Sequence, residues 1–202
     1  MGEKVVIIGD ASVGKSSLVY RYMHNAWTDN LKPTIGCDHC EKDVTVNGQT
    51  VKLSIWDTAG LERFRGLSNS YYGKAKCIVI VYDISRRASF EKVEFWREEI
   101  ANFADSNPVK ILVGTKLDLQ DKRAVLRDEG MNYANKHKLS FFIEVSALDN
   151  QGNGVQVLFD KVAELVLEMM HANAGSKTDL PRPVRLPEDG GAKPEGEEGC
   201  KC

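Results

Sequence analysis

The sequence predicts an α/β fold in three layers, with a six-stranded, mostly parallel sheet between two layers of helices. Short apolar runs, among them Cys77 to Tyr82 and Val109 to Val113, are typical of strands that are buried on both faces. Segments with helical spacing alternate with these runs, which indicates parallel strands joined by helical crossovers. Asn47-Gly48 lies between two strand-like segments and predicts a tight turn, so the resulting hairpin adds one antiparallel edge strand.

The predicted elements follow one another from the amino terminus. Val5 to Ile8 is predicted to form a buried strand that leads into a glycine-bounded loop, and Lys15 to about His24 is predicted to form a helix. Val44 to Val46 and Thr50 to Trp56 are predicted to pair as the hairpin. Phe141 to Val145 is a weaker candidate for the sixth strand.

Two later segments carry apolar residues at helical spacing. They are predicted to be amphipathic helices whose apolar faces belong to the core rather than to a binding site. The two sets are Phe90, Val93, Trp96, Ile100 and Phe103, followed by Val155, Leu158, Val162, Leu165 and Met169.

Length and composition indicate one soluble domain with a tail. The 202 residues and the hydrophobic content of 42% suit a single globular unit. Hydrophobic periodicity stops near Asn173, so we expect one domain over residues 1–172 and a disordered tail over residues 173–202. The net charge of -2 gives no reason to expect nucleic acid as a partner. No apolar run approaches the roughly 20 residues of a membrane-spanning helix, and we expect a cytosolic chain.

Two of the five cysteines form a Cys-x-x-Cys pattern, Cys37 and Cys40, with His39 between them. A structural zinc site needs four ligands, and no second pair of ligands follows in the sequence. If the segment is extended, residues three apart also point to opposite faces. We therefore set the zinc interpretation aside.

A phosphate-binding motif follows the first predicted strand. Gly9-Asp10-Ala11-Ser12-Val13-Gly14-Lys15-Ser16 matches G-x-x-x-x-G-K-[ST] and opens the first predicted helix. Its glycines let backbone N–H groups curl around phosphate oxygens at a helix terminus that favours anions. Lys15 would reach the β- and γ-phosphates, and the Ser16 hydroxyl would bind Mg²⁺. Asp57, in Asp57-Thr58-Ala59-Gly60 after the hairpin, could hold the same ion through water.

Two short segments after later strands select the base. Thr115-Lys116-Leu117-Asp118 follows one buried strand, and Ser146-Ala147-Leu148 follows the last strand. A carboxylate at Asp118 can accept two hydrogen bonds from the N1–H and the amino group of guanine. Adenine offers no such pair of donors, so the carboxylate would be left unpaired and adenine would be rejected.

The order GDASVGKS, PTIG, WDTAG, TKLD and SAL resembles the Ras-like GTPase superfamily over residues 3 to about 170. Within it, WDTAGLERFRGLSNSYY, the VYDIS strand end and the Cys-x-Cys terminus resemble the Rab branch. The resemblance implies the P-loop NTPase fold, GTP and GDP as ligands, Mg²⁺ as cofactor, and GTP hydrolysis to GDP and phosphate.

The resemblance also implies roles for individual residues. Thr34 would close over the nucleotide and bind the ion with Ser16 and Asp57. Trp27 would pack against the guanine, and Lys116 would lie along the same base. Ala147 would form a hydrogen bond with the carbonyl group of the base. The implied nucleotide contacts are Ser12, Val13, Gly14, Lys15, Ser16, Ser17, Trp27, Thr34, Gly60, Thr115, Lys116, Asp118, Ser146, Ala147 and Leu148. The implied effector surface comprises Ile35, His39, Trp56 and Tyr71.

Four positions depart from the family pattern. Thr115 stands where Asn is usual, which implies that some bonding between loops is lost, and Leu148 stands where Lys is common. His39 replaces a Phe of the effector surface. Leu61 stands where a Gln normally positions the attacking water, so we name no catalytic residue and expect slow intrinsic hydrolysis.

The tail carries Cys200 and Cys202, which resemble the double-prenylation site of Rab proteins. Two lipid chains matter because a single acyl chain holds a protein at a membrane only marginally. The tail is not polybasic, so we expect little help from anionic lipids.

These patterns together favour a GTP/GDP switch that recruits effectors to vesicle or organelle membranes. The resemblance implies five classes of partner, namely effectors, an exchange factor, a GTPase-activating protein, an escort protein and a GDP-dissociation inhibitor. The expected location is the cytoplasmic face of endomembranes, with a soluble pool. One rival is a metabolic P-loop kinase or ATPase, which gives no reason for Asp118 together with the SAL segment. The other rival, favoured by Leu61, is an interaction module that holds GTP almost permanently.

Overall fold

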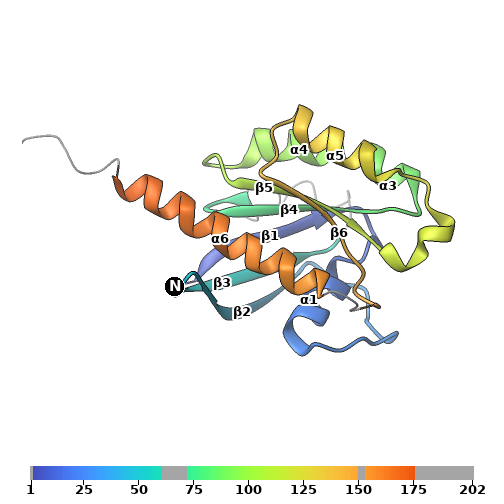
Figure 1. The fold of residues 1–202 in the computed structure, drawn as a ribbon, viewed down its shortest axis with the longest axis horizontal. Helices are drawn as coiled ribbons and strands as arrows, with labels where there is room; N and C mark the ends of the chain where they lie inside the picture. The colour runs from blue at the N-terminus through green and yellow to red at the C-terminus, as the bar shows by residue number, and fades with distance from the viewer. Residues whose placement is uncertain (1, 61–71, 150–152, 176–202) are drawn as a thin grey trace, which may run out of the picture.

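The computed structural model of the protein describes residues 2–60, 72–149 and 153–175. Within these ranges, six strands form one sheet between two layers of helices (Figure 1). The strand order is β2-β3-β1-β4-β5-β6, and all neighbours are parallel except β2, which is antiparallel to β3. The strands are β1 (Glu3–Gly9), β2 (Cys37–Val46), β3 (Gln49–Thr58), β4 (Cys77–Asp83), β5 (Val109–Thr115) and β6 (Phe141–Glu144). The predicted α/β class, the six strands and the single antiparallel edge are confirmed.

The helices divide between the two faces of the sheet. One face packs on α1 and α6, and the other packs on α3, α4 and α5 (Figure 1). The described helices are α1 (Lys15–His24), α3 (Arg87–Glu91), α4 (Val93–Phe103), α5 (Arg127–Lys136) and α6 (Gly154–Gly175), with a 3₁₀ helix η2 (Leu117–Lys122). Among these described elements, no helix is long and apolar enough to cross a membrane.

The alternation of side chains along β1 explains the two cores. Val5 and Ile7 belong to the core under α1 and α6, whereas Val6 and Ile8 belong to the core under α3, α4 and α5. Successive side chains of a strand point to opposite faces, so an unbroken apolar run fills both cores. The central strand β4 is buried at every position for the same reason.

The hairpin forms at the predicted turn and is longer than predicted. Val46 pairs with Gln49, and Asn47 and Gly48 between them both have positive φ, 52° and 76°. Pairing continues back to Cys37, opposite Thr58. The segment from Cys37 to Cys40 therefore belongs to β2 rather than to the loop before it.

Three other elements differ from the predictions. The stripe from Phe90 to Phe103 belongs to two helices, α3 and α4, rather than to one. The helix α5 was not predicted at all, because among its residues only Gly130 and Ala134 are buried. The last helix, α6, continues to Gly175, three residues past the expected end of the domain.

The carboxyl ends of the five parallel strands meet at one edge of the sheet. The loops that follow β1, β3, β4, β5 and β6 therefore lie close together, although they are far apart in sequence. All of the predicted nucleotide motifs lie in these loops or directly beside them. The end of α6 lies at the opposite end of the molecule, near the amino terminus (Figure 1).

Candidate nucleotide-binding site

The loop between β1 and α1 depends on glycine at both ends. Gly9 has φ 143°, and a Cβ there would lie 2.2 Å from the carbonyl oxygen of Val81 in β4. Gly14 has φ 96° and forms the N-cap of α1. Only glycine adopts these conformations without strain, so the sequence sets the curvature of the loop at these two points.

Lys15 lies inside this loop and is only 5% exposed. Its Nζ donates hydrogen bonds to the carbonyl oxygens of Gly9 (2.9 Å) and Asp10 (2.8 Å). Burial lowers the pKa of the Lys15 ammonium to about 8, although the carboxylates of Asp57 and Asp10 oppose this shift. The ammonium is therefore held in the loop that would receive phosphate groups.

Three oxygen-bearing side chains converge beside Lys15. The hydroxyl oxygens of Ser16 and Thr34 lie 2.7 Å apart, and Thr34 Oγ1 donates a hydrogen bond of 3.2 Å to Asp57 Oδ2. Asp57 is 3% exposed, and its Oδ1 has no hydrogen-bond partner among the described residues. Burial raises the pKa of this carboxyl, against the hydrogen bonds and the Lys15 charge. Hydroxyl and carboxylate oxygens are the ligands that Mg²⁺ prefers, so this donor set, with one unsatisfied buried oxygen, fits that ion.

Two adjoining cavities run along this edge of the sheet. A cavity of about 420 Å³ adjoins the phosphate loop, the segment 31–34 and the segment 58–60. A second cavity of about 260 Å³ continues past it and is mainly apolar. Both cavities share Gly14, Ser17, Trp27 and Lys116, so they form one cleft with a polar end and an apolar end. The second cavity is lined by Gly14, Ser17, Leu18, Trp27, Thr115, Lys116, Asp118, Ala147 and Leu148.

Ser146 fixes the carboxylate of Asp118 at the apolar end of the cleft. Its hydroxyl donates a short hydrogen bond to Asp118 Oδ1 and accepts hydrogen bonds from the backbone N–H groups of Leu148 (3.1 Å) and Asp149 (2.9 Å). One serine therefore organises both base-selecting segments.

Comparison with known proteins agrees with this arrangement. The chain matches the Ras family over residues 4–168. This protein belongs to the Ras family. It is 43% identical over 166 residues to Ras-related protein Rab-18-B of Danio rerio, which covers 82% of this chain and 79% of that protein. It is 40% identical over 194 residues to Ras-related protein rab-11.1 of Caenorhabditis elegans, and this match covers 91% of this chain and 90% of that protein. Ras-related protein Rab-18 of Lymnaea stagnalis is 43% identical over 166 residues, with 82% and 80% covered.

The relatives place the chain in the Rab branch, as the motifs predicted. It is a Rab-type small GTPase, and GTP and GDP are the ligands of this family. The expected GTPase activity and the Ras-like P-loop fold are therefore confirmed at the level of the family.

In this GTPase, Thr115 keeps a connection to the phosphate loop. The resemblance implied that some bonding between loops is lost where Thr replaces Asn, and Thr115 Oγ1 lies 2.5 Å from the carbonyl oxygen of Val13 in that loop. It also lies 2.8 Å from the carbonyl oxygen of Tyr82. The shorter hydroxyl side chain therefore still connects the two loops.

Two contacts of the segments that are predicted to select the base were not predicted from the sequence. Arg21 on α1 donates from Nε to the carbonyl oxygen of Ala147 (2.6 Å) and from Nη2 to that of Leu148 (3.0 Å). Lys116, with φ 61°, forms an ion pair of 2.8 Å with Asp83 at the end of β4. An Asp directly after a buried strand is a signal for the second contact, whereas nothing in the sequence marks Arg21.

Other residues that the resemblance implies as nucleotide contacts lie along the cleft. Ser12 and Gly60 line its phosphate end, and Leu148, which is 49% exposed, lines its base end. The side chain of Val13 is buried in the core, so only its backbone faces the loop interior. Trp27 is 36% exposed, and its indole N–H donates a 3.0 Å hydrogen bond to Asp29.

Three of the four expected effector residues lie in the described part of the chain. Ile35 is 90% exposed and follows Thr34 directly. His39 and Trp56 face each other across β2 and β3 with ring centroids 5.0 Å apart, and His39 Nε2 lies 2.8 Å from Ser54 Oγ. Tyr71 lies outside the described residues, as do Leu61, Cys200 and Cys202.

Proposed function

We propose that this GTPase is a guanine-nucleotide switch that recruits effectors to membranes in vesicle trafficking. The observation that carries the proposal is the position of Asp118. Its carboxylate, fixed by Ser146, lines the apolar end of a cleft whose other end holds Lys15 and Ser16. A base bound at Asp118 would place its phosphates at the loop before α1. The Rab-type relatives support the same function.

Ser16, Thr34 and Asp57 would hold Mg²⁺ in this scheme. When bound, the ion supplies positive charge to the β- and γ-phosphate oxygens. Lys15 would exchange its hydrogen bonds to Gly9 and Asp10 for phosphate oxygens, and the backbone amides of the loop would complete the binding site.

The switch would depend on the residues that line the phosphate end of the cleft. Thr34 and Gly60 both line that end of the cleft, so the presence of a γ-phosphate changes the contacts that each of them can make. Ile35 follows Thr34 directly, and Trp56 directly precedes Asp57, the hydrogen-bond partner of Thr34, so both would report this change to an effector, with His39 paired opposite Trp56. Effectors, an exchange factor and an activating protein are the partners that such a cycle requires.

Hydrolysis without an activator is expected to be slow because Leu61 has no polar atom to position a water. An activating protein that supplies the missing group would restore turnover. Without such an activator, the chain would remain GTP-bound and act as a lasting interaction module. Single-turnover hydrolysis with and without an activator separates these two outcomes.

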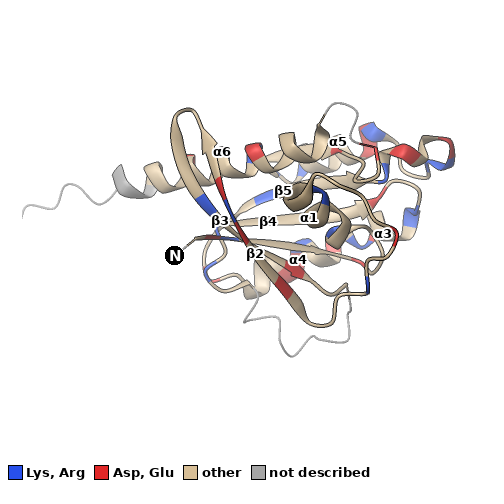
Figure 2. Cartoon of the chain, turned by 90° about the horizontal axis from the view of Figure 1, so that it is seen from below, with Lys and Arg blue, Asp and Glu red and all other residues tan. Residues whose placement is uncertain are grey.

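Cys200 and Cys202 are proposed to carry two prenyl groups, which an escort protein would help to attach and a GDP-dissociation inhibitor would cover in the soluble pool. The described part of this region ends with α6, at the end of the molecule opposite the carboxyl ends of the parallel strands (Figure 1, Figure 2). A membrane anchor that follows α6 would therefore be attached at the end away from the loops that carry the nucleotide motifs. Fractionation of a Cys200→Ser, Cys202→Ser variant tests the anchor, with Lys201→Ser as the control. Equal membrane fractions for the two variants would contradict it.

The base assignment is tested with Asp118→Asn. This change is expected to weaken GTP binding and to favour xanthosine triphosphate, whose base carries a carbonyl in place of the amino group. Asp121→Asn in the same 3₁₀ helix is the matched control, because Asp121 is exposed and lies outside the lining of both cavities. The measurement is the affinity of each variant for GTP and for xanthosine triphosphate. Equal GTP affinities of Asp118→Asn and Asp121→Asn would refute the assignment of Asp118 to the base.

A further inference from the structure

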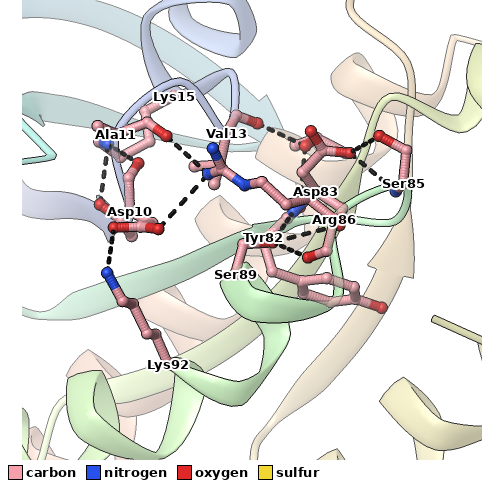
Figure 3. Close-up of polar contacts among 12 residues, drawn as sticks. Asp10, Ala11, Val13, Lys15, Tyr82, Asp83, Ser85, Arg86, Ser89 and Lys92 are labelled. Carbon is pink, nitrogen blue, oxygen red and sulfur yellow. Dashed lines mark hydrogen bonds and ion pairs between the residues drawn. The ribbon is translucent and has the colours of Figure 1, made fainter. Parts of the chain in front are cut away.

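The loop between β4 and α3 contacts the phosphate loop through Arg86 (Figure 3). Arg86 Nη2 donates a 2.7 Å hydrogen bond to the carbonyl oxygen of Ala11 and lies 3.5 Å from Asp10 Oδ2. The guanidinium therefore binds two consecutive residues of the phosphate loop, one by its backbone and one by its side chain. None of the nucleotide motifs predicted from the sequence includes Arg86.

Asp10 connects this contact to the phosphate-binding lysine. Its carboxylate is only 16% exposed and also pairs with Lys92 at 3.2 Å. Its backbone carbonyl oxygen accepts the 2.8 Å hydrogen bond from Lys15. We call Asp10, Arg86 and Lys92 the P-loop clamp. Arg86 and Lys92 contact the loop, but none of the three clamp residues lines either of the two cavities of the cleft.

The backbone of Arg86 is itself firmly held. Its N–H donates to the carbonyl oxygen of Asp83 (3.0 Å), and its carbonyl oxygen accepts from the N–H (3.0 Å) and the hydroxyl (2.7 Å) of Ser89, which is buried. The carboxylate of Asp83 pairs with Lys116 beside the base cavity. Arg86 therefore extends from a rigid segment that is joined to the base end of the cleft and reaches the phosphate end.

Two observations indicate a functional role rather than a purely structural one. The Nε–H of Arg86 is buried and has no hydrogen-bond partner among the described residues, an arrangement that costs stability. Such local costs are typical of functional sites. Ala11 is also the residue that Gly60 approaches, since a Cβ on Gly60 would lie 2.4 Å from Ala11 N. Arg86 and Gly60 thus act on the same short stretch of backbone.

We propose that Arg86 is a positioning residue that slows the release of bound nucleotide by keeping the phosphate loop closed. This inference rests on the nucleotide site proposed above. Release requires the loop amides to separate from the phosphates, and a guanidinium bonded to Ala11 and Asp10 opposes that movement. The clamp does not obstruct the entrance of the cleft, so nucleotide association is not expected to depend on it.

The test is the dissociation rate of a fluorescent GDP analogue from the full chain, chased with excess GDP at fixed Mg²⁺. Arg86→Ala is expected to release the analogue about tenfold faster, which corresponds to about 1.4 kcal/mol. Arg86→Lys retains the positive charge beside Asp10 but lacks the forked guanidinium. Its dissociation rate is expected to lie between those of Arg86→Ala and the wild type. The association rate of both variants should remain within about twofold of the wild-type rate. A general loss of structure would not change the dissociation rate while leaving the association rate unchanged.

Arg87→Ala is the matched control. Arg87 is the next residue and also an arginine, but it pairs with Glu129 and Glu91, away from the phosphate loop. Equal dissociation rates for Arg86→Ala and Arg87→Ala would overturn the proposal, and so would an Arg86→Lys variant no slower than Arg86→Ala. A wild-type chain that binds no guanine nucleotide would instead refute the proposed function.

Asp10→Asn completes the test as a double-mutant cycle with Arg86→Ala. If the two residues act as one clamp, the double variant should release nucleotide little faster than the faster single variant. If the double variant instead showed the product of the two single increases in dissociation rate, Arg86 would act without Asp10. That result would overturn the proposal that the two residues form one clamp.

Discussion

The hydroxyl of Thr115 lies 2.5 Å from the carbonyl oxygen of Val13, so one buried side chain connects the carboxyl end of β5 to the phosphate loop. The same hydroxyl lies 2.8 Å from the carbonyl oxygen of Tyr82 in β4. This hydroxyl stands where the resemblance leads us to expect the amide side chain of Asn. The contact shows that the base end and the phosphate end of the cleft are not independent.

Removal of this hydroxyl should destabilise the protein. Thr115→Ala removes the single hydroxyl hydrogen that the carbonyl oxygens of Val13 and Tyr82 share, and a lost buried hydrogen bond costs about 1–3 kcal/mol. Urea unfolding at a fixed GDP concentration measures the loss. Thr115→Ser is the control, since it keeps the hydroxyl and removes only a methyl group. A Thr115→Ala variant as stable as Thr115→Ser would show that the hydroxyl contributes nothing.

Gly130 on α5 gives a second stability prediction. Replacing a helical glycine with alanine usually stabilises by about 1 kcal/mol. Here a Cβ would lie 2.6 Å from the Tyr82 hydroxyl oxygen and 2.7 Å from the Phe142 ring, so Gly130→Ala should be destabilising by about 1–2 kcal/mol through overpacking. Asn132→Ala, at an exposed position of the same helix, should be neutral or stabilising. Thermal unfolding of the two variants tests the contrast, and a Gly130→Ala protein more stable than wild type would contradict it.

The extent to which the fold follows from the sequence depends on how each element buries its side chains. Strands such as β4 are apolar at nearly every position, so the sequence alone identifies them. The helix α5 was missed because it meets the sheet through a glycine and an alanine, and these residues produce no apolar stripe. The strand β2 was predicted too short because it lies at the edge, where its first residues are partly exposed and polar.

Glu94 on α4 links stability to pH. Its pKa is lowered from 4.5 to about 2, chiefly by hydrogen bonds from Arg97 and then by the hydroxyl of Tyr133 at 2.5 Å, against the effect of burial. A depressed carboxyl pKa stabilises the folded state above the unfolded value, and this contribution is lost as the pH falls from about 4.5 toward 2. The side chain is 41% exposed, so solvent screening limits the effect to about 1 kcal/mol or less.

The corresponding experiment compares urea unfolding of wild type and Glu94→Gln between pH 7 and pH 2.5. Wild type should be the more stable at neutral pH, and the difference should shrink through the acid range. Glu98→Gln, at an exposed position of the same helix, should show no comparable convergence. A Glu94→Gln difference that does not change with pH would mean that the carboxylate is not the stabilising species.

The site was predictable wherever its function depends on short motifs. The two glycines with positive φ, the lysine that follows the second of them and the carboxylate at Asp118 all lie in segments that the sequence marks. Arg21 and Arg86 could not be found in this way, because each acts through backbone carbonyl groups of a loop far away in sequence. Contacts between a side chain and a distant backbone leave no pattern in a single sequence, since any residue supplies the acceptor.

Leu61 lies outside the described residues, at the position where the resemblance leads us to expect a Gln that holds the attacking water. Phosphoryl transfer needs positive charge and amide donors around the γ-phosphate, and Lys15 and the phosphate loop can supply both. It also needs a water held in line with the γ-phosphate, and a leucine cannot hold one. Loss of a positioned polar group costs about 2–4 kcal/mol of barrier, which slows hydrolysis tens- to several-hundredfold. Leu61→Gln should therefore accelerate single-turnover GTP hydrolysis by about that factor and leave GTP affinity little changed. Leu61→Met, which is apolar and of similar size, should remain as slow as the wild type. Equal rates for Leu61→Gln and Leu61→Met, each without an activator, would show that this side chain does not limit hydrolysis.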